Sequence, residues 1–540
     1  MSRSKTIAEP RLIKRHGALV RCTHWINAIC LGVLLMSGLQ IFNAHPALYI
    51  GQTSDFQPPI FAIDSREVDG KSQGYTAVLG HSIDTSGVLG LSNVAGQPVE
   101  RAFPSWSTLP ATQDLGGGRQ WHFLAAWFLV INGLLYLVYG LVSRHFARDI
   151  VPDRTELAHT GQAIVDHARL KFPHGENARR YNVLQKLAYM GVIFVALPLI
   201  ALAGWTLSPG LDAAFPQLLQ LFGGRQTART VHFVIAFALV AFFIVHIAMV
   251  LVTGVFNNMR SMITGWFDAG EAKENEVPMR DRHQTRRGLL RGGLASLGGL
   301  ALAACDKVPG GDILSKLFDA EQAVTFAAQR AILGPNALAP EYGEADISPY
   351  FKPNGSTDPQ GEAYLKHVAG GFSDYRLKVD GLVDRPMAFS LAEIRAMPSR
   401  TQITRHDCVE GWSCIAQWTG AKLGDLLDRV GVQDKARYVV FHCFDAMDAD
   451  NSLDGEGTPF YGSIDLVSAR HVQTILAYDM NRRTLDVPHG APLRLRVERQ
   501  LGYKMSKYIE RIELVDSYAD FGEGHGGYWE DNGYSWYAGI

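Results

Sequence analysis

Four long apolar runs before residue 260 constrain this chain more than any other feature of its sequence. They cover roughly residues 22–43, 120–143, 182–207 and 229–255, and none of them contains an Asp or a Glu. The hydrocarbon core of a bilayer is about 30 Å thick, and about 20 helical residues cross it. Because each run meets this length and is followed by polar or Gly/Pro-rich sequence, we expect four membrane-spanning helices.

The distribution of Lys and Arg predicts how these helices are oriented. Both residues are frequent before the first run, between the second and third runs, and after the fourth, whereas they are sparse in the longer loop at about 44–119. Cytoplasmic loops are enriched in Lys and Arg. We therefore expect a multi-pass protein of a bacterial inner membrane, with a cytoplasmic amino terminus and a chain that returns to the cytoplasm near residue 256.

A shorter apolar stretch at 288–304 follows the pair Arg286-Arg287 and is similar to an internal twin-arginine export signal. It predicts three parts: a membrane domain at 1–260, a linker at 261–319, and an exported, periplasmic domain at 320–540. The alternative is an amphipathic linker with a cytoplasmic remainder. Cys305 ends a segment that resembles a lipoprotein processing site, and an intact fifth membrane helix is an equal alternative there.

Four histidines lie in or at the ends of the predicted spans. His232 and His246 are 14 residues apart, which leaves them within about 40° of one helix face and about 21 Å apart along it. His24 opens the first span on the cytoplasmic side, and His122 opens the second span on the opposite side. A lone histidine in an apolar helix is usually a hydrogen-bonded core residue. Four at matched depths instead favour two pairs, His122 with His232 outward and His24 with His246 inward.

Two axial imidazoles at each level are what a six-coordinate b-type haem needs. This pattern, with Arg21-Cys22-Thr23-His24-Trp25 at its start, resembles the four-helix di-haem cytochrome b subunits of nickel–iron hydrogenases and formate dehydrogenases over residues 15–260. The resemblance implies two b haems that exchange electrons with membrane quinone or quinol. The sequence of these residues does not indicate where a quinone would bind. The 44–119 loop exceeds what a hairpin connection needs, and we expect it to cap the outer haem or to dock the following domain.

From about residue 320 the sequence changes to short β-branched and aromatic runs punctuated by Gly, Pro and Asp. Strands are expected near 376–383, 438–443, 493–497 and 508–514, and brief helices near 391–397 and 423–430. This mixture predicts an α+β domain with substantial sheet.

Within this domain, Cys408 lies between polar residues and a Gly-Trp turn. From the residues alone, its sulfur could be a nucleophile, a metal ligand or a packed side chain. The six cysteines of the chain show no CxxC spacing, so neither a zinc ribbon nor an iron–sulfur cluster is indicated.

The segment Cys408-Val409-Glu410-Gly411-Trp412-Ser413 resembles the molybdopterin-binding domain of the sulfite oxidase superfamily. It is closer to the periplasmic methionine-sulfoxide-reductase catalytic subunits than to the sulfite oxidases. The resemblance spans roughly 335–516 and implies that the sulfur of Cys408 binds molybdenum.

Two further segments are similar to cofactor-contacting parts of that family. One is the turn and strand from His489 to Arg494, and the other is the loop at 502–507, which in the family surrounds the pterin phosphate. A dianionic phosphate is bound by free N–H groups and basic side chains. The resemblance implies the following cofactor-binding residues: Asn354, Cys443, His489, Arg494, Lys504, Ser506 and Lys507.

The chain also departs from the family pattern. His489 stands where the reductases carry an amide side chain, and Met505 where a smaller residue is usual. These departures weaken the transfer of the reductase substrate more than the transfer of its cofactor.

The two halves together predict a multidomain fold: a four-helix transmembrane bundle, with or without a fifth helix, plus an α+β molybdopterin-binding domain. We expect a respiratory molybdoenzyme that reduces a small-molecule or protein-bound sulfoxide with electrons from quinol. Two alternatives remain: a sulfite-type dehydrogenase that passes electrons to quinone, and a membrane cytochrome with a metal-free interaction module. The net charge of −2, from 51 Lys and Arg against 53 Asp and Glu, gives no electrostatic case for nucleic-acid binding.

Overall fold

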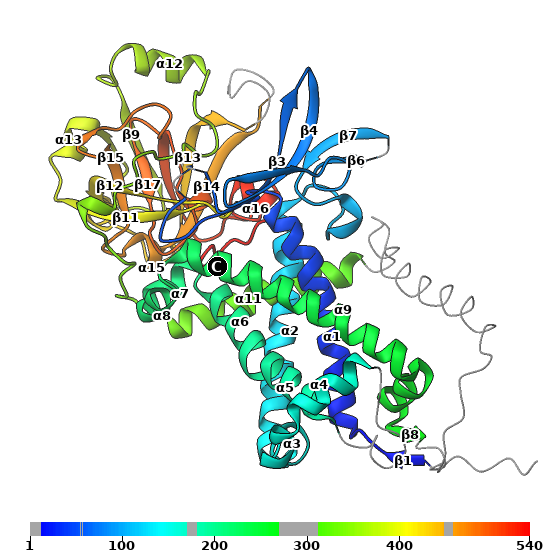
Figure 1. The fold of residues 1–540 in the computed structure, drawn as a ribbon. Coiled ribbons are helices and arrows are strands. Elements are labelled where there is room, and N and C mark those ends of the chain that lie inside the picture. Colours follow the sequence, from blue (N-terminus) through cyan, green and yellow to red (C-terminus); the bar gives the residue numbers. More distant parts are fainter. Residues whose placement is uncertain are drawn as a thin grey trace, which may run out of the picture. The chain divides into compact units, whose positions relative to one another are not determined.

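The chain forms two compact units, each built from several segments (Figure 1). The computed structural model describes residues 12–54, 56, 58–94, 96–169, 181–268, 311–447 and 457–540. The first unit comprises Met1–Leu35, His122–Ala201 and His232–Gly311, and the second comprises Met36–Trp121, Leu202–Val231 and Asp312–Ile540. Arg286-Arg287, Cys305 and the stretch at 288–304 lie outside the described residues. The sequence-based boundaries at 260 and 319 stay a prediction.

Four helices are long and apolar enough to cross a membrane, which confirms the expected fold class. They are α1 (Ala18–Phe42), α2 (Leu115–Val142), the succession α5 (Val183–Gly191), η4 (Val192–Ala196) and α6 (Leu197–Trp205), and α9 (Arg225–Thr264). The third span begins with a capping box in which the side chain of Asn182 accepts a hydrogen bond from the backbone N–H of Gln185. Gly254, with a φ of 105°, interrupts the helical backbone of α9.

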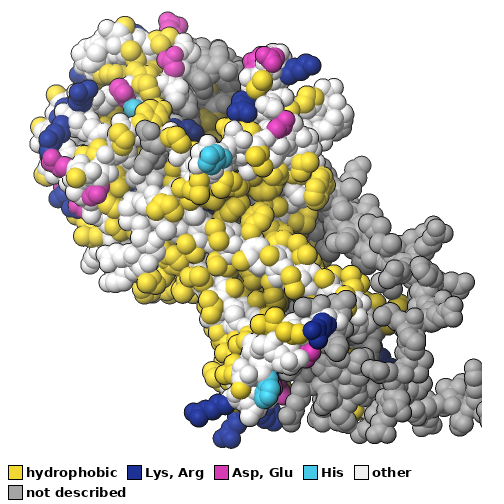
Figure 2. Space-filling view, in the orientation of Figure 1, with side chains coloured by type: hydrophobic (Ala, Val, Ile, Leu, Met, Phe, Trp, Pro, Cys, Tyr) yellow, Lys and Arg dark blue, Asp and Glu magenta, His cyan; other side chains and the backbone are white. Residues whose placement is uncertain are grey.

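The surface of these helices suits a lipid environment. In α2, Leu134, Leu135 and Val138 are between 57% and 61% exposed, and in α9 Phe243 and Ile244 are exposed to a similar degree. Figure 2 shows hydrophobic side chains covering the helices of the first unit. Large apolar side chains in such numbers are not left facing water in a soluble protein, and the chain is a multi-pass membrane protein.

The remaining elements of the first unit are short and lie at helix ends. β1 (Leu12–Lys14) pairs antiparallel with β8 (Trp266–Asp268). The connection between α2 and α5 holds η2 (Phe146–Ile150), α3 (Arg154–Ala158) and α4 (Thr160–Ala168).

Two five-stranded sheets form the core of the second unit. The first has the order β10-β9-β18-β13-β14, with β9 (Arg376–Gly381), β10 (Met387–Ser390), β13 (Tyr438–Ala446), β14 (Pro459–Asp465) and β18 (Ile509–Val515). The second contains β11 (Ser399–Asp407), β12 (Ser413–Lys422), β15 (Ile475–Met480), β16 (Arg483–Thr484) and β17 (Arg494–Arg496). Only β9 and β18 pair parallel among these strands. The strands confirm the predicted α+β domain.

One long helix, α11 (Gly311–Ile332), precedes the sheets in the chain. The helices between and after their strands are shorter: α12 (Glu362–Ala369), α13 (Leu391–Arg395), α14 (Leu423–Val430), α15 (Leu466–Ala469) and α16 (Tyr528–Asp531). In α14 the fully buried residues Leu423, Leu426, Leu427 and Val430 follow the spacing of one helix face. Gly431 ends this helix with a φ of 73°, a conformation that glycine adopts without a Cβ penalty.

The loop between α1 and α2 belongs to the second unit and is largely β-structure. It holds β2 (Ala47–Leu48), β3 (Phe61–Val68), β4 (Lys71–Val78) and β5 (His81–Asp84) in one sheet, and β6 (Gly90–Val94) and β7 (Gln97–Arg101) in another. The backbone N–H of Ser54 donates a 2.8 Å hydrogen bond to the carbonyl of Ser413. The loop therefore docks on the domain that follows, one of the two roles expected for it. Two further short helices of this unit, α7 (Pro209–Ala214) and α8 (Pro216–Leu221), precede α9.

Candidate active site and histidine pairs

The structure brings the four membrane histidines together in two pairs. The ring centres of His122 on α2 and His232 on α9 are 6.2 Å apart, with 54° between the ring planes. Those of His24 on α1 and His246 on α9 are 6.3 Å apart, with 53° between the planes. These are the partners expected from the helical spacing and the direction of the spans.

The spacing within each pair fits one metal ion between two imidazoles. Two metal–nitrogen bonds of about 2 Å each, with about half a ring at either end, span roughly 6 Å. Nδ1 of His232 donates a 2.9 Å hydrogen bond to the carbonyl of Ile200, which leaves Nε2 as the basic nitrogen. Nδ1 of His24 is buried and has no hydrogen-bond partner among the described residues. The donor set therefore fits a bis-histidine haem at each pair.

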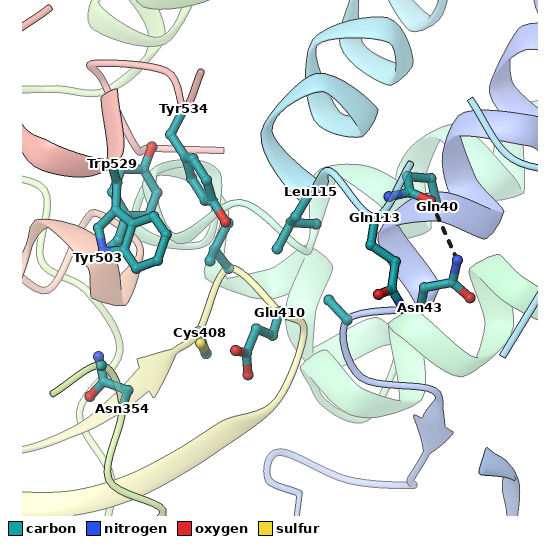
Figure 3. Close-up of a pocket in the computed structure, with 13 residues that line it drawn as sticks. Gln40, Asn43, Gln113, Leu115, Asn354, Cys408, Glu410, Tyr503, Trp529 and Tyr534 are labelled. Carbon is teal, nitrogen blue, oxygen red and sulfur yellow. Dashed lines mark hydrogen bonds between the residues drawn. The ribbon is translucent and has the colours of Figure 1, made fainter. Parts of the chain in front are cut away.

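Cys408 lies in a tight turn directly after strand β11. Its backbone N–H donates to the carbonyl of Trp412 at 3.0 Å, and its own carbonyl accepts from the N–H of Gly411 at 3.0 Å. The fully buried indole of Trp412 donates to the carboxylate of Glu410 at 2.7 Å. This turn fixes the thiol at the wall of a cavity (Figure 3), where Cys408 is 7% exposed. Burial raises the pKa of the thiol, and binding to a soft metal ion is what would hold it as a thiolate.

A buried network of charged side chains stabilises the turn that holds Cys408. The guanidinium of Arg405 donates to both carboxylate oxygens of Asp407, at 2.7 and 3.0 Å, and to Asp212 on α7 at 2.7 Å. Arg225, in the first turn of α9, lies 3.5 Å from Asp407. Burial alone would raise the pKa of Asp407, but Arg225 and Arg405 outweigh it and lower this pKa to about 2.

The same turn of α9 also contacts the backbone around Cys408. The amide of Gln226 donates to the carbonyl of Gly411 and to the hydroxyl of Ser413, both at 3.0 Å. Arg225 donates to the same hydroxyl at 3.0 Å, and Ser413 passes a 2.7 Å hydrogen bond on to Asp407. The position of the Cys408 turn is therefore set by residues of α9 as well as by its own sheet.

The cavity beside Cys408 has a volume of about 300 Å³. Figure 3 shows Tyr503, Trp529 and Tyr534 on one side of Glu410, and the amides of Gln40, Asn43 and Gln113 on the other, with Asn354 on the side of the aromatic residues. The lining residues are Gln40, Asn43, Ala44, Gln113, Leu115, Asn354, Gly355, Cys408, Val409, Glu410, Tyr503, Trp529 and Tyr534.

A smaller cavity of about 30 Å³ shares Asn354, Gly355, Tyr503 and Trp529 with the first and is lined in addition by Lys507. Beside it, the guanidinium of Arg494 is fully buried and donates to the side-chain oxygen of Asn354 at 3.0 Å. The three predicted cofactor residues Asn354, Arg494 and Lys507 therefore lie together beside the smaller cavity, which shares four lining residues with the cavity at Cys408.

Arg494 and Lys507 provide positive charge where an anionic cofactor would bind. Arg494 Nε is buried without a hydrogen-bond partner, and the ammonium of Lys507 donates to the carbonyls of Ser356 and Pro488 and to the hydroxyl of Tyr508. Neither cation has a carboxylate partner within hydrogen-bond distance in the described part of the chain. Burial, with Arg494 close by, lowers the pKa of Lys507 to about 7. Buried cations that no carboxylate contacts are costly, and a phosphate would supply such a contact.

Asp445 also lines the small cavity and acts electrostatically on Lys507. Burial raises the pKa of its carboxyl, and the charge of Lys507 opposes that rise.

The other predicted cofactor residues are placed differently. Cys443 is buried in the core strand β13 and lines neither cavity. Ser506 is also buried, and its backbone carbonyl accepts from Leu495 at 2.8 Å. His489 lies beside Arg494: its carbonyl accepts from that guanidinium at 3.2 Å, while its ring contacts Asp486 at 2.6 Å and the carbonyl of Phe351 at 3.2 Å.

Lys504 forms a buried ion pair with Glu530 of α16, in which the two side chains are 1% and 3% exposed. The ammonium also lies 5.4 Å from the ring centre of Trp536. The charge of Lys504 is therefore compensated within the chain, and a contact with phosphate stays a prediction for this residue.

Removing the ammonium of Lys504 is expected to destabilise the second unit. Lys504→Met leaves the Glu530 carboxylate buried without its cation, and breaking a buried pair in this way costs about 3–5 kcal/mol. Scanning calorimetry should show a lower transition temperature for the single variant and recovery in Lys504→Met/Glu530→Leu. A role in binding phosphate would instead lower the molybdenum content of both variants.

Several residues of the site carried no signal in the sequence. Gln40 lies in the last turn of α1 and Asn43 directly follows that helix, whereas Gln113 comes from the end of the first-to-second loop and Trp529 and Tyr534 from the carboxy-terminal tail. The aromatic residues of the tail had no motif, and a role as surface cover was the interpretation available for them. These residues are far from Cys408 in the sequence, and they come close to it only in the folded second unit.

Comparisons with known proteins agree with both halves of the chain. Residues 15–265 match the family described as prokaryotic cytochrome b561, and residues 366–521 match the oxidoreductase molybdopterin binding domain. YedZ1 of Azospira oryzae, provisionally named as a protein-methionine-sulfoxide reductase subunit, is 35% identical over 283 residues, which are 52% of this chain and 95% of that protein. The chain belongs to the YedZ1 family. A second YedZ1 protein of the same organism is 30% identical over 235 residues, which are 44% of this chain and 89% of that protein.

The soluble part of this YedZ1-family chain has its own relatives. The protein-methionine-sulfoxide reductase catalytic subunit MsrP of Xanthomonas axonopodis is 34% identical over 151 residues, which are 27% of this chain and 46% of MsrP. Among solved structures, the sulfane dehydrogenase SoxCD of Paracoccus pantotrophus has 22% identity and a TM-score of 0.23, over 27% of this chain and 39% of that one. A likeness as low as the last carries no argument. The YedZ1-family chain is thus a membrane-bound oxidoreductase with a molybdopterin-binding domain and a b-type cytochrome domain.

Proposed function

We propose that this chain reduces a sulfoxide at a periplasmic molybdopterin site, with electrons that come from membrane quinol through two b haems. The observation that carries the proposal is the combination, in one chain, of a cavity lined by Cys408, the buried cations Arg494 and Lys507 near it, and two histidine pairs. The names of the YedZ1 and MsrP relatives support sulfoxide as the substrate class.

In the proposed reaction, one quinol reduces one sulfoxide. A sulfoxide accepts two electrons and two protons and yields a sulfide and water, because the S=O bond breaks and its oxygen leaves as water. One quinol supplies two electrons and two protons and becomes quinone. Each haem carries one electron at a time, so the relay operates twice for each sulfoxide.

The four histidines are the proposed axial ligands: His122 with His232, and His24 with His246. When bound, molybdopterin supplies a two-electron centre that accepts an oxygen atom from the substrate. Cys408 would hold its metal ion. Arg494 and Lys507 would neutralise its phosphate, with Asn354 and Ser506 beside them and His489 behind Arg494.

Glu410 is the proposed proton donor of the site. It is the one carboxylate among the described residues that line the 300 Å³ cavity, and its side chain is 41% exposed. The indole of Trp412 holds one carboxylate oxygen in place at 2.7 Å. Glu410 can therefore exchange protons with water and pass them to an oxygen atom that leaves the substrate.

The proposed topology follows from charge. Arg144, Arg148 and Arg154 lie exposed at the connection between α2 and α5, which the enrichment of basic residues places in the cytoplasm. With four spans, the opposite ends of the helices and the loop between α1 and α2 are periplasmic. The molybdopterin-binding domain contacts that loop and lies on the same side of a bacterial inner membrane.

Purified protein should contain about one molybdenum and two b haems for each chain. We expect oxidation of reduced dye by methionine sulfoxide, and no reduction of a quinone analogue by sulfite. Metal analysis, pyridine haemochrome spectra and both assays on one sample check this. Full haem content without molybdenum would favour a membrane cytochrome with a metal-free interaction module. Turnover of sulfite, without turnover of methionine sulfoxide, would favour a sulfite-type dehydrogenase that passes electrons to quinone.

A further inference from the structure

Helix α11 of the second unit exposes an apolar stripe along its length. The stripe consists of Ile313, Leu317, Ala320, Val324, Ala327 and Ala331. Their alternating spacing of four and three residues keeps them within an arc of about 80° on one helix face. All of them are exposed, and Ile313, Leu317 and Val324 are between 43% and 68% exposed. Single exposed apolar residues are common on soluble proteins, but a continuous row of them indicates an interaction surface.

The buried face of the same helix is polar. Among its described residues, the most buried are Glu321, Thr325 and Gln329, which are between 4% and 8% exposed. The hydroxyl of Thr325 donates to the carboxylate of Glu321 at 2.6 Å. A helix on the surface of a water-soluble domain turns its apolar side inward and its polar side outward. The most buried and the most exposed faces of α11 show the reverse arrangement, which suits an apolar medium outside the stripe.

Two contacts place α11 at the ends of membrane-spanning helices. The ring of Phe318 packs edge-on against Trp121 near the start of α2, with 5.3 Å between the ring centres. A Cβ atom added at Gly210 of α7 would lie 2.6 Å from the side-chain oxygen of Gln329, so α11 also adjoins the connection between the third and fourth spans. The part of α2 that follows Trp121 is still long enough to cross the hydrocarbon core. Both contacts therefore lie where the spans leave the bilayer.

The last turns of α11 are fixed to the molybdopterin-binding domain. Arg330 forms an ion pair with Asp465 and donates to the hydroxyl of Ser468 at 3.0 Å. The ring of Phe326 packs edge-on against Tyr537, with 5.1 Å between the ring centres. The helix is thus held at both ends while its apolar stripe stays uncovered by the described residues.

We propose that α11 is an interfacial helix whose apolar stripe lies among the headgroups and upper acyl chains of the bilayer. Helices of this kind lie in the plane of the interface, with the apolar face about 5–10 Å deep and charged residues beside it in water. Lys316 and Asp319 are exposed charged residues outside the stripe and fit that second requirement. Because α11 contacts the start of α2, it extends the lipid-contacting surface of the spans to the molybdopterin-binding domain. This inference does not depend on the proposed reaction.

Photo-cross-linking in the full-length holoprotein tests the position of the stripe. A diazirine-bearing amino acid replaces Leu317 or Val324, and the protein is reconstituted in nanodiscs of phosphatidylethanolamine and phosphatidylglycerol. Mass spectrometry after illumination should find lipid adducts on α11. Asp319 is the matched control, because it is exposed on the same helix away from the stripe. Its adduct yield should be several-fold lower, whereas Leu135, exposed on α2, should give adducts as a positive control.

The haem spectrum of each labelled protein shows whether it has folded, independently of the cross-link. Equal lipid adduct yields at residues 319 and 324, with adducts at Leu135, would overturn the proposal. Cross-links from residue 324 to a second copy of the chain, in place of lipid, would also overturn it, because the stripe would then be a protein interface.

Discussion

Replacing Cys408 by Ser is expected to abolish sulfoxide reduction while the haem spectrum stays unchanged. A hydroxyl is a hard, weakly acidic donor, whereas a soft metal ion prefers thiolate. Among the described residues that line the cavity, Cys408 is also the one that carries a sulfur, so no other thiol is placed to replace it. We expect turnover with reduced dye to fall below about a hundredth of the wild-type rate.

Cys414→Ser is the matched control for this variant. Cys414 is fully buried on the next strand, β12, and lines neither cavity. Dye-linked turnover, molybdenum content and the reduced-minus-oxidised haem spectrum should be measured on all three proteins. Wild-type turnover in Cys408→Ser would refute the assignment of this sulfur, and equal losses in both variants would point to a folding defect.

Removing one histidine of a pair is expected to separate the two halves of the reaction. His246→Leu leaves His24 without an axial partner, so the haem content should fall from two to about one for each chain. Quinol-driven sulfoxide reduction should then stop. Reduction driven by a dye that reaches the soluble domain directly should continue, because the cavity at Cys408 is unchanged.

His232→Leu should have the same effect at the other pair, and His81→Leu, at an exposed position of β5, is the control. Leucine suits an apolar helix, so the membrane part should still fold. Haem stoichiometry from pyridine haemochrome spectra, with quinol-driven and dye-driven rates, decides the outcome. Two haems in either variant would contradict the ligand assignment.

The pairing of the histidines could be predicted because it depends on local regularity. A helix repeats every 3.6 residues and successive spans run in opposite directions, so the position of His232 fixes which level His122 and His24 can reach. Four strands and two brief helices of the second unit were also predictable from local pattern, whereas β11 and β12, the strands that flank Cys408, were not among those predicted. Cys408 itself stood out because a motif of six consecutive residues surrounds it.

The wall of the cavity could not be predicted, because it depends on contacts between distant segments. Gln40 and Trp529 line the same space although nearly the whole chain separates them. Likewise, the sequence of its loop predicts that Lys504 is a phosphate ligand. Its ion-pair partner Glu530 becomes apparent only in the fold. Side-chain partners of this kind depend on the tertiary arrangement, which no local periodicity encodes.

The contacts that α7 and α9 make with the Cys408 turn limit how this protein can be divided into fragments. A soluble fragment that begins near residue 320 would lack Arg225, Gln226 and Asp212, and would leave Asp407, Arg405 and the carbonyl of Gly411 without these partners. In this chain we therefore expect the Cys408 turn to be complete only when residues 202–231 are folded against it.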